Sequence, residues 1–174
     1  MTANEAVMLD GSVARVGDPG KIVIATRFGE MEFDPSQAIH LPRGVLGFPG
    51  KQTFALAQLP QPGMSHFSLL QCLDDPELSF LVLPFDIESG AIDRADLERA
   101  RDELGIAADD LAVVLIVAIR EVADRPEISV NLRAPILLDA QKRTGAQSVL
   151  TNSKYPVRHL ISPQPPSAPS SDIG

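Results

Sequence analysis

Apolar and polar residues fall into short runs along most of the chain, and turn residues separate the runs at close spacing. The runs at 22–28, 53–59, 67–73 and 78–85 have the length and β-branched content of strands. Residues 111–119 are apolar at nearly every position, which predicts a central strand covered on both faces. Helices do not alternate with these strands, so a parallel doubly wound sheet is disfavoured.

A single helix is predicted at about 93–104. Asp93 is a suitable N-cap, and Gly105 supplies the C-terminal stop. The apolar stripe of this helix consists of Leu97, Ala100 and Leu104. The predicted fold class is therefore mainly β: an antiparallel roll or partly open β-barrel with one α-helix.

Two connections contain residues found in functional sites, but their patterns favour a structural role. Residues 39–50 contain three glycines but no helix start, so we expect tight bends that send Ile39, Leu46 and Phe48 into the core. Residues 74–77 hold three carboxylates beside a proline, which is typical of a solvated turn. Residues 120–126 are expected to be a polar connection.

The ends of the chain differ in composition from its middle. Residues 1–20 are polar and mixed, which predicts a flexible leader with one weak strand near 7–9. Residues 21–161 form a single β-rich domain in this interpretation. Residues 162–174 are rich in Pro and Ser and predict a disordered tail, because they cannot bury enough apolar surface to offset ordering.

Charge limits the classes of partner. The formal net charge is −8, and residues 86–110 hold nine Asp or Glu against three Arg. An acidic chain repels phosphate backbones, so we expect no direct binding of nucleic acid but a good fit to a partner with a basic surface. The longest apolar run is too short to span a membrane, and no signal peptide is recognised, so a cytoplasmic location without membrane contact is expected.

Residues for catalysis are not grouped in the sequence. The three histidines, His40, His66 and His159, lack the spacing of metal ligands, and Cys72 lies in an apolar run typical of a buried, inert thiol. Neither a nucleophile elbow nor a phosphate loop is present. We therefore expect no catalytic residue, no metal and no cofactor, and the chain is interpreted as a non-enzyme.

The stretch 128–152 has a distinct pattern, Asn-Leu-Arg-Ala-Pro followed by apolar residues, Asp, and later Gly-x-Gln-x-Val-Leu. Pro135 cannot donate a ladder hydrogen bond, so it belongs at a strand start, an edge or a bulge. Residues 136–138 and 149–150 are predicted as short strands, with 142–145 as the turn between them.

Four blocks of the sequence resemble the flagellar assembly factor FliW family. They are residues 26–32, 41–48, 69–80 and the stretch from 128 through Tyr155, and they cover most of residues 22–157 in the order of that family. Two departures lie in the last block. Ala146 stands where the family usually has Lys, and Asp139 stands where it often has Asn.

The resemblance implies a role in protein binding. Proteins of this family bind the RNA-binding translational regulator CsrA, relieve its repression of flagellin mRNA, and bind flagellin in a mutually exclusive partner switch. The polar residues of the family-like blocks are the candidate contacts for a partner: Asp75, Glu77, Asn131, Arg133, Gln147 and Tyr155. Other interpretations stay open, namely a flagellin chaperone alone, a small-molecule-binding β-barrel or an unrecognised hydrolase.

Three of these candidates also have a structural interpretation. Asn131 and Gln147 could satisfy backbone groups near Pro135 and Gly145. Tyr155 could be half-buried packing instead of an anchor for a partner. In that case the loss of Asn131 would lower stability, and binding would fall only as folding does.

We predict that the purified protein has no intrinsic affinity for RNA, because its charge has the wrong sign and no basic, aromatic stripe is present. A gel-shift assay at low salt with the leader of a CsrA target mRNA measures this, with CsrA as the positive control. Binding by this protein alone that weakens steeply with salt would contradict the prediction.

Overall fold

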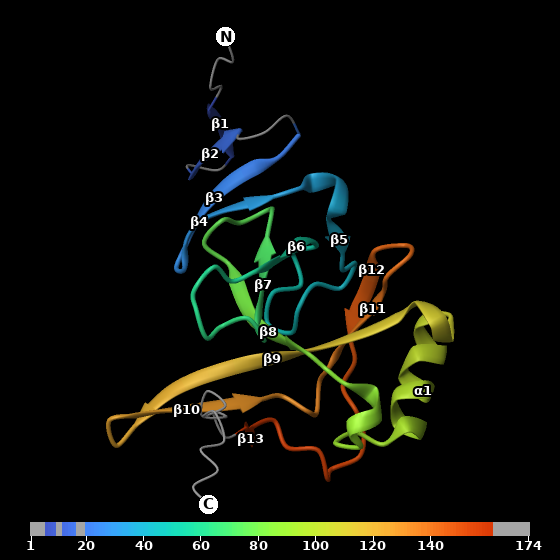
Figure 1. Cartoon of the computed structure of the whole chain (residues 1–174). Helices are drawn as coiled ribbons and strands as arrows, with labels where there is room; N and C mark the ends of the chain where they lie inside the picture. Colours follow the sequence, from blue (N-terminus) through green and yellow to red (C-terminus); the bar gives the residue numbers. More distant parts are fainter. Residues whose placement is uncertain (1–5, 10–11, 17–19, 162–174) are drawn as a thin grey trace, which may run out of the picture.

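The computed structural model describes residues 6–9, 12–16 and 20–161, which form two sheets and one α-helix (Figure 1). The smaller sheet is antiparallel, in the order β1-β2-β3-β4. Its strands are β1 (Ala6–Leu9), β2 (Ser12–Val16), β3 (Ile22–Thr26) and β4 (Gly29–Phe33). The predicted strand at 22–28 corresponds to β3, and β4 forms a hairpin with it.

The larger sheet has nine strands and closes on itself. In sheet order they are β11 (Ile136–Asp139), β12 (Thr144–Gln147), β5 (Ile39–His40), β6 (Thr53–Gln58), β7 (Ser68–Cys72), β8 (Ser79–Pro84), β9 (Leu111–Val122), β10 (Arg125–Val130) and β13 (His159–Ile161). A further pairing joins β11 to β9, so the seven strands from β11 to β9 form a ring. Only the contact of β12 with β5 is parallel, through Thr144 and His40. The predicted fold class, mainly β with an antiparallel roll or partly open barrel and one α-helix, is confirmed, and the pairing of β11 with β9 closes the barrel.

The ring has an apolar cluster on each face of its wall. Phe54, Leu70 and Val114 belong to a cluster built only from the ring and the bend at 41–45, so this cluster fills the interior. Their sequence neighbours Leu69 and Val113 point to the opposite face, as the period of a strand requires. The outer face is buried against elements outside the ring.

Two elements cover the outer face. Ile24, Met31 and Phe33 of the β3–β4 hairpin pack on one part of it, and Figure 1 shows that hairpin lying above β6 and β7. Leu97 and Ala100 of the helix pack on another part. The burial of these apolar side chains is worth roughly 25 cal/mol for each Å² removed from water.

The single α-helix, α1 (Arg94–Leu104), agrees with the predicted range. Gly105 ends it with φ 69° in the left-handed region, and its N–H donates to the carbonyl of Asp102. Asp93 is the N-cap residue, as predicted, but its carboxylate pairs with Lys154 and makes no capping hydrogen bond. Three short 3₁₀ segments are Pro35–Gln37, Ile87–Ser89 and Ala108–Asp110. None of the helices in the described part of the chain is long and apolar enough to cross a membrane.

The two ends of the chain have different outcomes. Residues 1–20 are predicted to be a leader with one weak strand near 7–9, and β1 lies at that position. The structure also has β2, which pairs with β3. The smaller sheet therefore starts earlier than the predicted boundary at residue 21. The predicted tail, 162–174, lies outside the described residues.

The central strand is longer than predicted. β9 continues through residues 120–122, which we expected to be part of a polar connection, and only its first half is buried. A two-residue turn, Ala123 and Asp124, joins it to β10, and both residues have positive φ, 50° and 61°. Such a turn matches the twist of a tight hairpin, but it lacks the glycine that would mark it in the sequence. The hairpin projects from the body of the molecule at the lower left of Figure 1.

The bend at 41–50 has a different buried set from the predicted one. Leu41 and Val45 are buried, together with the predicted Ile39, whereas Leu46 is 56% and Phe48 41% exposed. Gly44 has φ 66°, and a Cβ there would lie 2.2 Å from the carbonyl oxygen of Phe48. Because Gly44 is left-handed, the chain turns there, and the alternation of buried and exposed side chains before it does not continue after it.

Gly145 lies where the β11 backbone passes too close for a side chain. A Cβ at this position would be 2.3 Å from the carbonyl oxygen of Leu137. We predict that Gly145→Ala lowers the free energy of unfolding by ~1–3 kcal/mol, the usual cost of overpacking. Gly50→Ala is the matched control, since a Cβ there meets nothing within 4 Å. Chemical denaturation of both variants measures the effect, and equal midpoints would contradict the close approach.

Candidate partner-binding surface

A wide bulge connects β10 to β11. Val130 is opposite Val117, and Ile136 is opposite Val114, so two residues of β9 face the five residues 131–135. β10 and β11 therefore pair one after the other with the same edge of β9. The connection between them has three residues more than the part of β9 that it faces. Pro135 ends this bulge, which is one of the positions that its missing N–H allows.

Asn131 and Arg133 hold the bulge in shape. The side-chain oxygen of Asn131 accepts the N–H groups of Arg133 and Ala134 at 3.0 and 3.1 Å. The guanidinium of Arg133 donates from Nε to the carbonyl of Tyr155 at 2.9 Å and from a terminal nitrogen to the carbonyl of Ser153 at 3.3 Å. These hydrogen bonds agree with the structural interpretation, in which both side chains satisfy nearby backbone groups.

Gln147 joins two segments that are distant in sequence. Its amide oxygen accepts the N–H of Leu46 at 2.8 Å, and its amide nitrogen donates to the carbonyl of Ala134 at 3.0 Å. The side chain therefore ties the bend at 41–50 to the bulge. It lies in β12, which begins at Thr144, inside the predicted turn.

The reversal between β11 and β12 is earlier than predicted because Asp139 organises it. The buried carboxylate of Asp139 accepts the N–H groups of Gln141 and Lys142 at 3.0 and 2.9 Å, and Arg143 has φ 52°. An Asn oxygen could accept the same two bonds, so the departure at 139 preserves the turn chemistry. The predicted strand at 149–150 is extended but lies beyond the end of β12.

Tyr155 fixes the start of α1. Its side chain is only 2% exposed, its hydroxyl accepts the N–H of Asp93 at 2.9 Å, and it donates to Oδ2 of Asp96 at 2.5 Å. Burial and the bond to Asp96 raise the pKa of this hydroxyl. The ammonium of Lys154 pairs with Asp93, and this bond raises the pKa of Lys154. A partner could reach Tyr155 only by displacing neighbouring groups.

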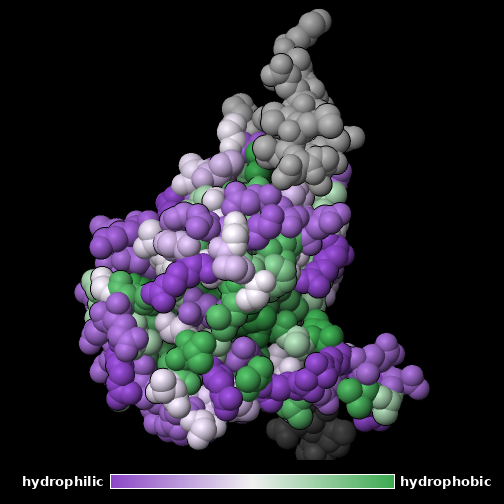
Figure 2. Space-filling model, turned by 180° about the vertical axis from the view of Figure 1, so that it is seen from behind, coloured by the Kyte–Doolittle hydropathy of each residue, from purple (hydrophilic) through white to green (hydrophobic). Residues whose placement is uncertain are grey.

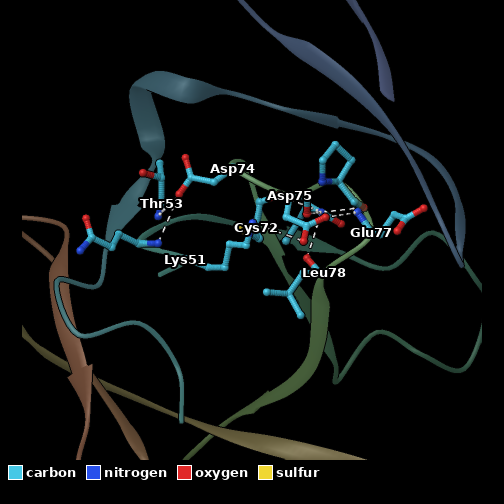
Figure 3. Close-up of polar contacts among 10 residues, drawn as sticks. Lys51, Thr53, Cys72, Asp74, Asp75, Glu77 and Leu78 are labelled. Carbon is cyan, nitrogen blue, oxygen red and sulfur yellow. Dashed lines mark hydrogen bonds and ion pairs between the residues drawn. The ribbon is translucent and has the colours of Figure 1, made fainter. Parts of the chain in front are cut away.

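Asp75 and Glu77 lie in the turn between β7 and β8 (Figure 3). Oδ1 of Asp75 accepts the N–H of Glu77 at 3.1 Å, and Oδ2 is 3.5 Å from the ammonium of Lys51. The neighbouring Asp74 accepts the N–H of Thr53 at 3.0 Å. The carboxylate of Glu77 is exposed.

The predicted contact residues therefore form two groups. Asp75 and Glu77 belong to the β7–β8 turn. The other four, Asn131, Arg133, Gln147 and Tyr155, are bonded into the framework around the bulge. Residues 41–51 touch both groups, through Leu46 at one end and Lys51 at the other. Whether these side chains also contact a partner stays a prediction.

The structure adds a groove that sequence reasoning missed. It has a volume of about 400 Å³ and lies between α1, the bend and the extended segment 146–151. Its lining includes the exposed side chains Arg43, Leu46, Arg99, Glu103 and Val149. A second hollow of about 270 Å³ shares Arg43 and Ala146 with it. The sequence predicts Leu46 in the core and Val149 in a strand, because apolar character alone does not distinguish a buried side chain from an exposed one.

Candidate groups for metal binding or catalysis are few. No set of three or more His, Cys, Asp or Glu side chains that could hold a metal occurs among residues 6–9, 12–16 and 20–161. Cys72 is buried inside the ring, and burial raises the pKa of its thiol. A thiolate is therefore disfavoured at this position.

Hydrophobic side chains also gather on one broad area of the surface. Seen from behind, they run across the middle of the molecule, bordered by hydrophilic side chains, with the β9–β10 hairpin projecting at the lower right (Figure 2). The exposed large apolar residues of the described chain are Leu46, Phe48, Leu56, Ile119, Val122, Val149, Val157 and Leu160. Apolar surface of this kind is typical of proteins that bind other proteins.

Comparison with known proteins gives a consistent family. A family model described as FliW protein matches residues 22–161. The chain is 36% identical over 138 residues to the flagellar assembly factor FliW of Magnetococcus marinus, covering 78% of this chain and 82% of that protein. It is 35% identical over 138 residues to the flagellar assembly factor FliW of Geobacter sulfurreducens, covering 79% and 84%.

A solved structure agrees with these sequence matches. The crystal structure of a flagellar assembly factor FliW superposes with a TM-score of 0.58 at 27% identity, over 84% of this chain and 99% of that one. The chain belongs to the FliW family.

We predict that Asn131→Ala lowers the free energy of unfolding by about 1 kcal/mol or more, because two N–H groups of the bulge lose their acceptor. Asn152→Ala is the control, since the Asn152 side chain accepts a single bond, from Lys154, and is exposed. It should cost less than ~0.5 kcal/mol. Urea unfolding compares the two, and a similar small effect in both would show that the bulge does not depend on Asn131.

Proposed function

We propose that this FliW family protein is a non-enzymatic flagellar assembly factor that acts in the cytoplasm through two protein partners. One is a CsrA-type RNA-binding translational regulator, whose repression of flagellin mRNA it relieves. The other is flagellin. Binding of the two partners is mutually exclusive, so the amount of free flagellin sets how much of the protein is available to the regulator.

The observation that carries this proposal is the family match across residues 22–161, which includes the whole ring and the helix that covers it. The relatives are named flagellar assembly factors, a role that implies protein partners in flagellar assembly. The partner switch itself is what the family resemblance implies, and it extends that role to this chain.

Electrostatics supports a basic partner. The arginines of α1 are engaged locally, since Arg94 pairs with Glu88, Arg99 with Asp96 and Arg101 with Asp102. Glu98 and Glu103 are exposed on the same helix and form no ion pair with a described residue. The acidic excess of 86–110 is therefore not cancelled within the helix. A regulator that binds RNA needs cationic surface, so the two proteins attract one another.

The interior of the ring favours a protein partner over a small molecule. Phe54, Leu70 and Ile136 fill it with fully buried side chains. A ligand inside the ring would have to displace this cluster. The filled interior therefore favours binding at the surface over binding of a ligand inside the ring.

We expect isothermal titration calorimetry to detect binding of both CsrA and monomeric flagellin, and saturation with flagellin to abolish the heat of CsrA binding. Binding of both partners at once would contradict the exclusive switch. Binding of flagellin without CsrA would identify a flagellin chaperone alone. Heat from neither partner would contradict the proposed function as a whole.

The double variant Glu98→Lys, Glu103→Lys tests the electrostatic support. It should lower the association rate constant with CsrA at low salt by ~10-fold, since steering depends on the sign of the surface field. Glu121→Lys with Asp124→Lys on the β9–β10 hairpin makes the same change in net charge and is the control. Stopped-flow kinetics measures both, and equal slowing would show that only the net charge matters.

A further inference from the structure

The segment 144–150 offers an unused strand edge. On one side it follows β11 and the bulge, where the N–H groups of Ser148 and Leu150 donate to the carbonyls of Pro135 and Arg133 at 2.9 and 2.7 Å. Hydrogen-bonding groups alternate between the two sides of an extended strand. The N–H and C=O of Val149 therefore point to the other side, where they have no hydrogen-bond partner among the described residues.

The parallel contact with β5 does not cover this edge. It consists of the single pair Thr144 and His40, after which the chain leaves β5 and enters the bend. The bend reaches the edge again only through the bond from the N–H of Leu46 to the side chain of Gln147. From Gln147 onward the edge borders the groove of about 400 Å³ described above.

The walls of the groove fit a peptide chain with an apolar residue. Leu46 is 56% and Val149 55% exposed, and both line the groove, Leu46 from the bend and Val149 from the strand edge itself. Ala146 and Ala100 contribute small side chains that leave the space open. An added strand places alternate side chains toward such pockets while its main chain pairs with the edge.

The charges in the groove have opposite signs on different elements. Arg43 on the bend is exposed and forms no ion pair with any described residue. Glu103 on α1 is also exposed and forms no ion pair with any described residue. A segment that carries an acidic residue toward the bend and a basic residue toward the helix would complement both.

We propose that this groove binds an extended segment of a protein partner by strand addition to residues 147–149. The segment has an apolar residue between Leu46 and Val149 and an acidic residue beside Arg43. The inference rests on the proposed function only in taking the occupant to be a protein, and it specifies how that protein is held. α1 then serves as the second wall and not as the pairing surface.

The test uses a probe that does not depend on the identity of the partner. A phage library of random linear dodecapeptides is selected on the full chain, and an enriched sequence is synthesised. Its affinity is measured for the wild type, for Val149→Glu, and for Val157→Glu as the control. Val157 is a valine of the same exposure, 58%, outside the groove. Arg43→Glu, with Arg158→Glu as its control, tests the acidic position in the same way.

We expect Val149→Glu and Arg43→Glu to weaken the peptide at least tenfold, and both controls to stay within twofold. In the wild type, the amide proton of Val149 should exchange more slowly once the peptide is bound. That measurement on the unmodified chain does not depend on how the variants fold.

The inference would be overturned if no sequence is enriched over bare support, if Val149→Glu binds the peptide as tightly as the wild type, or if exchange at Val149 is unchanged. A peptide that binds as a helix, shown by its circular dichroism, would overturn strand addition in favour of helix docking. If the peptide behaves as expected while CsrA and flagellin do not bind, the proposed function fails and the groove stands. If those proteins bind without protecting Val149, the function stands and the groove fails.

Discussion

The bulge at 131–135 is the constraint on which the rest of the structure depends. It lets a single edge of β9 serve two purposes, because β10 uses the outer half of that edge and β11 the inner half. Without the three extra residues, the chain after Val130 would continue in register along β9, and Arg133 instead of Ile136 would lie opposite Val114 on the interior face. The interior cluster around Phe54 and Ile136 exists only because the ring closes. Asn131, which satisfies two N–H groups of the bulge, is thus coupled to a core that it does not touch.

The same bulge positions the helix. Its carbonyls accept hydrogen bonds from Ser148 and Leu150, and Arg133 holds the chain near Tyr155. Tyr155 in turn bonds the backbone of Asp93 and the carboxylate of Asp96, at the first turn of α1. A short series of buried or half-buried polar contacts therefore runs from the edge of β9 to the helix. Both walls of the groove are set by it, which gives a surface feature the rigidity that binding without large rearrangement requires.

The sequence predicted the elements whose signal is local. The helix and the strands β6 to β8 follow from apolar periodicity and from Gly105 or Pro-containing turns, and those signals need no tertiary contact. It failed where the residue types do not fix the backbone conformation, and where the decisive contact joins distant segments. Gly44 reverses the alternation of the bend, so Leu41 and Val45 are buried and Leu46 is not. Ala123 and Asp124 adopt positive φ without a glycine, which hid the hairpin. Asn131 and Gln147 are candidate contacts in the sequence. Their role in holding the bulge and the bend could be seen only in the fold, which shows the groups that they bond.

The internal hydrogen bonds of these residues limit which side chains can bind a partner. A side chain whose hydrogen bonds are used inside the molecule can contact a partner only at the cost of those bonds, and an unmet buried group costs about 1–3 kcal/mol. Asn131, Arg133, Gln147 and Tyr155 are all in this position. Arg43, Leu46, Glu103 and Val149 are not, since their side chains are exposed and have no hydrogen bond or ion pair with a described residue. A partner gains the full value of apolar burial or charge pairing from the second set without weakening the fold. The residues with the clearest sequence pattern therefore build the surface, and the less distinctive ones beside them are free to bind.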